Sequence, residues 1–125
     1  STNGASELSY NPTVITDVSS DMDIASEEIF GPIATIFTFK DEADVIRQAN
    51  DTIYGLAAYF YSSSYARSWR VTEGLEYGII GHNTGLISTE VAPFGGVKQS
   101  GFGREGSKYG IEEYVVTKYW CSDVS

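Results

Sequence analysis

Three features of the sequence belong to types that perform chemistry in other proteins: one cysteine, one histidine and one glycine-rich motif. Cys121 is the only cysteine and His82 the only histidine. A thiolate can act as a nucleophile, and an imidazole can transfer protons or bind a metal ion. Residues 101–106 read GFGREG, which matches the glycine spacing of a phosphate-binding loop for dinucleotides.

We interpret all three features as structural. Cys121 follows an apolar and aromatic run, and no sequence neighbour suggests the lowered pKa that a reactive thiol needs. His82 has no second histidine and no cysteine at ligand spacing, so a metal site is not expected. The glycine motif follows residues 93–100, which have the composition of a loop, whereas a dinucleotide fingerprint needs a preceding strand. The segment is therefore expected to hold no catalytic residue and no metal.

Composition and charge argue against several classes of protein. The formal net charge of −9 would repel a phosphate backbone, so nucleic-acid binding is not expected. No apolar stretch is long enough to cross a membrane, and residues 1–6 lack the features of a signal peptide. One cysteine permits no internal disulfide and is compatible with a reducing compartment. We expect a soluble chain, cytoplasmic by default, or mitochondrial if its source is eukaryotic.

Acidic residues are concentrated in the first part of the chain, where six carboxylates precede the first basic residue, Lys40. These carboxylates either form a solvated face or pair with a basic region outside this chain. Charge statistics alone favour the solvated face.

The pattern of apolar and polar residues predicts strands that alternate with helices. Asp41 is expected to cap a helix that ends near Asn50, and residues 62–64 to cap a second helix that ends at Gly74. Strands are predicted over residues 13–18, 33–39, 56–61, 77–82 and 113–121. Strands and helices in this order indicate crossover connections and a parallel sheet.

The remaining segments are predicted to be turns and loops. Residues 21–25 are expected to form a turn, and residues 83–110 an ordered loop region that holds seven of the thirteen glycines. Two helices cannot easily cover both faces of a parallel sheet. Other protein, from a longer chain or from a second copy, is therefore expected to cover the rest.

Two stretches resemble the aldehyde dehydrogenase superfamily in residue types, order and separation. They are residues 27–32 (EEIFGP) and 93–105 (PFGGVKQSGFGRE). Asn50 with residues 54–56, and residues 78–83, are also similar to that family. The resemblance implies an α/β fold, namely a parallel-sheet βαβαβ segment of the catalytic domain plus a C-terminal oligomerisation strand.

The resemblance also implies how the chain is divided. Residues 1–12 are expected to be a flexible lead-in, and residues 13–110 the C-terminal part of an incomplete, nucleophile-bearing catalytic domain. Residues 111–125 are expected to form the oligomerisation strand and a tail. Because an unpaired strand edge favours sheet extension, the resemblance implies a homo-oligomer that assembles through this strand.

In the family, the glutamate at the position of Glu28 binds the nicotinamide ribose, and the aromatic residue at Phe30 packs against the nicotinamide. A carboxylate can accept two hydroxyl hydrogen bonds, and a flat ring provides contact area. Without the resemblance, Glu28 would be interpreted as a surface carboxylate and Phe30 as an aromatic residue of the core. The implied cofactor is NAD or NADP in the parent enzyme, with none expected tightly bound here; the residues that choose between them lie upstream.

Residues 83–93 and 106–112 resemble those of succinate-semialdehyde dehydrogenases. There, the serine at Ser88 helps to bind the distal carboxylate of the substrate, together with arginines outside this segment. A hydroxyl is a suitable but weak donor to a carboxylate. The alternative is that Ser88 is an ordinary loop residue.

Two residues depart from the family pattern. His82 replaces a residue that is commonly small and apolar. Val116 stands where many relatives carry a glutamate that pairs with the arginine matching Arg104. Arg104 is therefore expected to pair with Glu112 or Glu113, or to remain solvated.

The family's nucleophilic cysteine, general-base glutamate and nucleotide-binding domain all lie upstream of the matched segment. The sequence therefore predicts the C-terminal part of an NAD(P)-dependent dehydrogenase that acts on a small aldehyde, succinate semialdehyde, and is inactive alone. Two alternatives remain open. In the first, the parent enzyme belongs to another aldehyde substrate subfamily; in the second, the chain is a non-catalytic module that assembles through its sheet edge.

Overall fold

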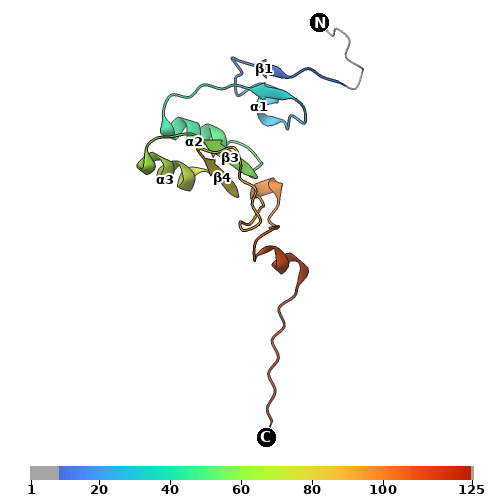
Figure 1. Ribbon diagram of the computed structural model, residues 1–125. Coiled ribbons are helices and arrows are strands. Elements are labelled where there is room, and N and C mark those ends of the chain that lie inside the picture. The colour runs from blue at the N-terminus through green and yellow to red at the C-terminus, as the bar shows by residue number, and fades with distance from the viewer. Residues whose placement is uncertain (1–8, 125) are drawn as a thin grey trace. The chain divides into compact units, whose positions relative to one another are not determined.

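The computed structural model describes residues 9–124, so residues 1–8 of the expected lead-in lie outside the described part of the chain. Contacts between residues divide the chain into two units, Ser1–Val45 and Ile46–Ser125. Figure 1 labels their helices and strands. Within the described residues, no helix has the length and apolar character needed to cross a membrane.

The first unit contains two short parallel strands, β1 (Thr13–Ile15) and β2 (Ile33–Thr35). Burial alternates along both strands, so one face of this small sheet is partly covered and the other is exposed. The short helix α1 (Asp23–Ser26) lies in the connection between them. Val18, which follows β1, is buried. The unit therefore holds its strands with little apolar core.

Two predictions for the first unit were wrong in detail. The turn expected over residues 21–25 contains α1, because the Glu27 N–H donates to the Asp23 carbonyl at 2.9 Å and closes a helical turn. The strand expected over residues 33–39 ends at Thr35, because its partner β1 is only three residues long. Local propensity indicated extended backbone there but not the length of the partner strand.

Helix α2 (Glu42–Asn50) begins and ends as predicted. The Asp44 N–H donates to Asp41 Oδ1 at 2.9 Å, which is the expected N-terminal cap. At the other end, Asn50 Nδ2 donates to the Gly74 carbonyl at 2.8 Å, and Asn50 Oδ1 accepts from the Glu76 N–H at 2.9 Å. Asn50 thus ties the end of α2 to the end of the next helix.

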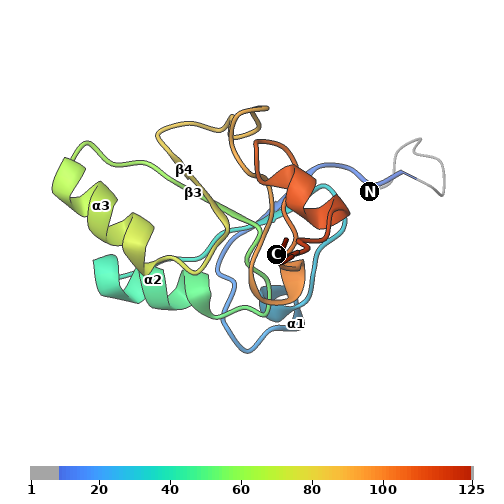
Figure 2. The same cartoon turned by 90° about the horizontal axis from the view of Figure 1, so that it is seen from below.

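The second unit is built on a β-α-β crossover of β3 (Ala57–Phe60), α3 (Tyr65–Gly74) and β4 (Ile79–His82). The two strands are parallel, with Ala57 opposite Ile79 and Phe60 opposite His82. Ser64 caps α3 as predicted, because its Oγ accepts from the Arg67 N–H. Figure 2 shows α2 and α3 next to each other beside the two strands.

The strands do not form the single parallel sheet that was expected. Among residues 9–124, β1 pairs with β2 and β3 pairs with β4, in two separate sheets. Which strand edges pair is a long-range property that strand propensity does not specify. The α/β character and the parallel pairing are both confirmed.

The chain beyond β4 consists of loops and two 3-10 turns, η1 (Lys98–Ser100) and η2 (Gly110–Tyr114). The strand expected over residues 113–121 does not form within the described chain. Its first residues belong to η2, and residues 115–124 carry no regular secondary structure (Figure 1). A strand requires a neighbouring strand to satisfy its backbone groups, and this chain provides none there among the residues described.

Candidate functional site

Glu28 and Phe30 lie in the loop of residues 27–32, between α1 and β2 of the first unit. The loop is held by main-chain bonds at both ends: Glu27 N–H donates to Asp23, and the Pro32 carbonyl accepts from Thr13, each at 2.9 Å. Both side chains are exposed, and Phe30 keeps 96% of its surface accessible. A carboxylate and a free ring face are thus available to a ligand at this loop.

Ser88 lies in the second unit, on a loop that we call the serine loop (residues 83–93). The loop begins with Asn83, whose backbone has a φ of 56°. Asn83 Oδ1 accepts from the Ser62 N–H and Asn83 Nδ2 donates to the Ser62 carbonyl, both at 2.9 Å. This pair of bonds fastens the start of the serine loop to the segment that follows β3.

The middle and the end of the serine loop are also fixed. Thr84 Oγ1 accepts from the Leu86 N–H at 3.1 Å, which closes a local turn. At the far end, the Glu90 carbonyl accepts from the Ser107 N–H at 2.9 Å. Ser88 itself is exposed. Its hydroxyl is therefore presented to solvent from a loop whose flanks are both anchored.

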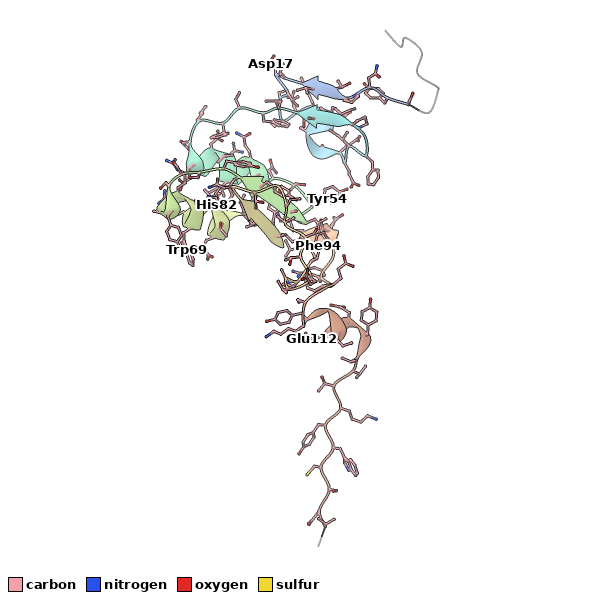
Figure 3. The ribbon with its side chains drawn as sticks, viewed as in Figure 1. Asp17, Tyr54, Trp69, His82, Phe94 and Glu112 are labelled. Atoms are coloured by element: carbon pink, nitrogen blue, oxygen red, sulfur yellow. The ribbon has the colours of Figure 1, made fainter. Side chains whose placement is uncertain are left out.

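His82 makes structural contacts at the end of β4 (Figure 3). Its Nε2 lies 2.8 Å from Ser68 Oγ and 3.1 Å from the Ser62 carbonyl, and its ring stacks on Phe60 at 4.9 Å. The Ser68 hydroxyl donates to the Ser64 carbonyl, so Ser68 Oγ accepts from an Nε2–H. The side chain that departs from the family pattern therefore ties β4 to the first turn of α3.

A second anchored segment follows the serine loop, formed by residues 94–105 and closed by an antiparallel bridge between Phe94 and Glu105. Lys98 holds it in place. Its Nζ lies 2.6 Å from Glu76 Oε2, and it donates to the carbonyls of Asn50 at 2.9 Å and Thr52 at 3.2 Å. Sequence reasoning missed Lys98 and Asn83 as anchors, because bonds to distant backbone leave no local pattern.

Arg104 pairs differently from the expectation. Its Nη1 donates to the carbonyls of Gly96 at 2.7 Å, Phe102 at 3.0 Å and Gly103 at 2.9 Å. Glu113 does contact Arg104, but its Oε1 accepts from the Arg104 backbone N–H at 3.2 Å. The guanidinium therefore organises this segment through backbone carbonyls, and Glu113 contacts the Arg104 backbone instead of the guanidinium.

The glycine motif at residues 101–106 is irregular backbone that includes Glu105, the bridge partner of Phe94. It follows η1 and opens no α-helix, and Gly101 and Gly106 have φ values of 94° and 67°. A dinucleotide fingerprint requires a strand before it and a helix within it. The described residues around the motif provide neither, so that context is not present here.

Comparisons with known proteins agree with the sequence resemblance. The model of the aldehyde dehydrogenase family matches residues 1–120. The mitochondrial succinate-semialdehyde dehydrogenase of Arabidopsis thaliana is 67% identical over 112 residues, which cover 90% of this chain and 21% of the relative. The NADP(+) succinate-semialdehyde dehydrogenase of Escherichia coli (strain K12) is 62% identical, with 90% and 23% covered.

A third relative carries a different substrate in its name. The glutarate-semialdehyde dehydrogenase of Pseudomonas putida (strain KT2440) is 59% identical over 115 residues, covering 92% of this chain and 24% of the relative. The crystal structure of a succinate-semialdehyde dehydrogenase from Burkholderia pseudomallei has a TM-score of 0.86 at 65% identity, covering 90% of this chain and 23% of that one. The chain thus spans 21 to 24% of the length of these proteins. With a family model over nearly its whole length, the chain belongs to the aldehyde dehydrogenase family.

Proposed function

We propose that this chain forms part of an NAD(P)-dependent dehydrogenase that oxidises succinate semialdehyde to succinate. One observation carries the proposal: an exposed hydroxyl, Ser88, sits on an anchored loop in a chain 67% identical to a protein named for that substrate. A bound nicotinamide would accept the hydride. The residues of this chain would bind and orient the two reactants.

The loop of residues 27–32 is proposed to hold the cofactor. Glu28 accepts hydrogen bonds from two ribose hydroxyls, and the ring of Phe30 packs against the nicotinamide. Their exposure supports this assignment, because neither side chain is committed to a core. The name of the Escherichia coli relative includes NADP(+), and the choice between NAD and NADP depends on residues outside this chain.

Ser88 is proposed to donate its hydroxyl hydrogen to the distal carboxylate of the substrate. One neutral donor is too weak to hold a carboxylate alone, so cationic side chains from elsewhere in the protein must contribute. A substrate with one more methylene, glutarate semialdehyde, is the second candidate, because the Pseudomonas putida relative with that name is 59% identical.

The nucleophile and the general base are proposed to lie in the part of a longer protein that this chain does not span. The matched part of the chain covers only 21 to 24% of the length of its relatives. In this proposal, residues 13–110 complete a catalytic domain after the lead-in of residues 1–12. The chain alone is then inactive, and a non-catalytic assembly module is the alternative.

Assembly is proposed to involve residues 111–125. Tyr114, Val116 and Trp120 are 83%, 94% and 84% exposed, and aromatic and β-branched residues favour strands. This segment would add as a strand to a second copy of the protein. We infer a cytoplasmic location, or a mitochondrial one if the source is eukaryotic, as the name of the Arabidopsis thaliana relative includes "mitochondrial".

The test compares this chain with the full-length gene product. Both are assayed for reduction of NAD and NADP at 340 nm, about the absorbance maximum of the reduced nicotinamide, with succinate semialdehyde and glutarate semialdehyde. The full-length protein is expected to turn over, with the higher kcat/KM for succinate semialdehyde, and the chain alone to be inactive. Turnover by the chain alone would contradict the proposal and would return Cys121 to consideration as the nucleophile.

A further inference from the structure

The serine loop folds back onto strand β4 at Gly81. Gly81 is buried and pairs with Tyr59 of β3. Its backbone does not have a positive φ, so its conformation alone does not require glycine. Space does. A Cβ at this position would lie 2.7 Å from Tyr59 Cδ1, 2.9 Å from the Thr84 carbonyl oxygen and 3.0 Å from Ile87 Cγ2.

Two of these three neighbours belong to the serine loop. The Tyr59 ring can rotate away, but the Thr84 carbonyl is backbone, and it can move only if the loop moves. Ile87 directly precedes Ser88 and is half-buried, whereas Ser88 is exposed. The position of Ile87 against the bare surface of Gly81 therefore sets where Ser88 is presented.

We propose that Gly81 is a specificity-determining positioning residue, whose missing side chain lets Ile87 seat on β4 and so fixes the reach of Ser88 toward the substrate carboxylate. This inference rests on the proposed role of Ser88. A methyl group at position 81 lifts residues 84–87 and lengthens the hydrogen bond from Ser88 to the carboxylate. Hydrogen bonds weaken steeply as their geometry departs from the ideal. An aldehyde without a carboxylate does not depend on that bond.

The experiment measures kcat and KM of the full-length gene product for succinate semialdehyde and for butanal, which has four carbons but no carboxylate. Gly81→Ala is expected to raise the KM for succinate semialdehyde about tenfold, with kcat and the KM for butanal within about twofold. Gly85→Ala is the matched control in the same loop, because a Cβ there meets nothing within 4 Å. That control should leave all constants unchanged.

Ser88→Ala and the double variant with Gly81→Ala separate the two proposals. If Gly81 acts through Ser88, the double variant shows no further rise in KM beyond that of Ser88→Ala alone. Additive effects, or an equal rise for butanal, would mean general damage and would overturn the positioning role. If Ser88→Ala raises the KM but Gly81→Ala does not, the inference about Gly81 fails alone. If Ser88→Ala leaves the KM for succinate semialdehyde unchanged, the proposed roles of Ser88 and of Gly81 are both contradicted.

A second variant covers the case in which Gly81→Ala does not fold. Ile87→Ala removes the contact between the Ile87 side chain and Gly81, and it adds no atoms to strand β4. It is expected to raise the KM for succinate semialdehyde about threefold, less than Gly81→Ala, because the Thr84 turn remains. An unchanged KM for this variant would overturn the proposal.

Discussion

The two loops that carry the proposed ligand contacts are held in different ways. The loop of residues 27–32 is fixed at its ends by main-chain bonds, and Phe30 within it is 96% exposed. The serine loop and the segment after it are fastened by side chains, among them Asn83 and Lys98. The second region is therefore preformed by its own packing. The first presents exposed side chains, Glu28 and Phe30, which are proposed to contact the cofactor.

This difference predicts a separation of effects. Substitutions at the side-chain anchors of the second unit should lower the free energy of unfolding. They should weaken ligand binding only because the fold is destabilised. Substitutions at the exposed side chains of the first loop should alter cofactor binding and leave stability unchanged. Each variant below tests one side of that comparison.

The largest effect on stability is expected from Lys98→Met. The substitution removes an ion pair with Glu76, one of two donors to the Asn50 carbonyl, and the donor to the Thr52 carbonyl, while the aliphatic length is kept. The free energy of unfolding should fall by about 2–3 kcal/mol, measured by urea denaturation of the full-length gene product. Lys108→Met is the matched control, since Lys108 lies over the ring of its neighbour Tyr109 on the surface. Equal losses in the two variants would contradict the anchoring role of Lys98.

A smaller effect, on binding alone, is expected from Phe30→Ala. Because the Phe30 ring is exposed and packs into no core, the melting temperature of the variant should stay within about 1 °C of that of the unsubstituted protein. The Kd for NAD(P) should rise about tenfold, because the stacking contact is lost. Isothermal titration calorimetry measures the Kd, and Phe30→Tyr, which keeps the ring, is the control. A large loss of stability with an unchanged Kd would show that Phe30 is a core residue of the full-length protein.

The smallest effect is expected from Gly31→Ala, in the same loop as Phe30. A Cβ at Gly31 meets nothing within 4 Å, and the residue has no positive φ. The free energy of unfolding should change by less than about 0.5 kcal/mol, and any change should be a gain, because alanine restricts the unfolded chain. A loss of more than about 1 kcal/mol in a denaturation experiment would show that this loop is packed as tightly as the serine loop.

Local signals in the sequence predicted helices α2 and α3 well. Asp41 and Ser64 cap α2 and α3 as expected, and the strands after them pair in parallel. The pairing of β1 with β2 was not predicted, because it depends on which strand edges meet in space. Helix α1 was missed because four residues carry too little periodicity to distinguish a helix from a turn.

The candidate site was less accessible to prediction from residue types alone. Glu28, Phe30 and Ser88 were selected through the family resemblance, and nothing in their spacing would have distinguished them from other surface residues. The anchors Asn83 and Lys98 bond to backbone 21 and 46 to 48 residues away in the sequence. Such bonds have no local signature, so only the folded chain reveals which polar residues are structural.

The central claim is that the serine loop presents Ser88 to the carboxylate of a semialdehyde. Its most direct test is the ratio of kcat/KM for succinate semialdehyde to kcat/KM for butanal, in the full-length gene product and in Ser88→Ala. The account predicts that the ratio falls at least about tenfold, through KM for the semialdehyde alone. An unchanged ratio would contradict the claim and leave Ser88 as an ordinary loop residue.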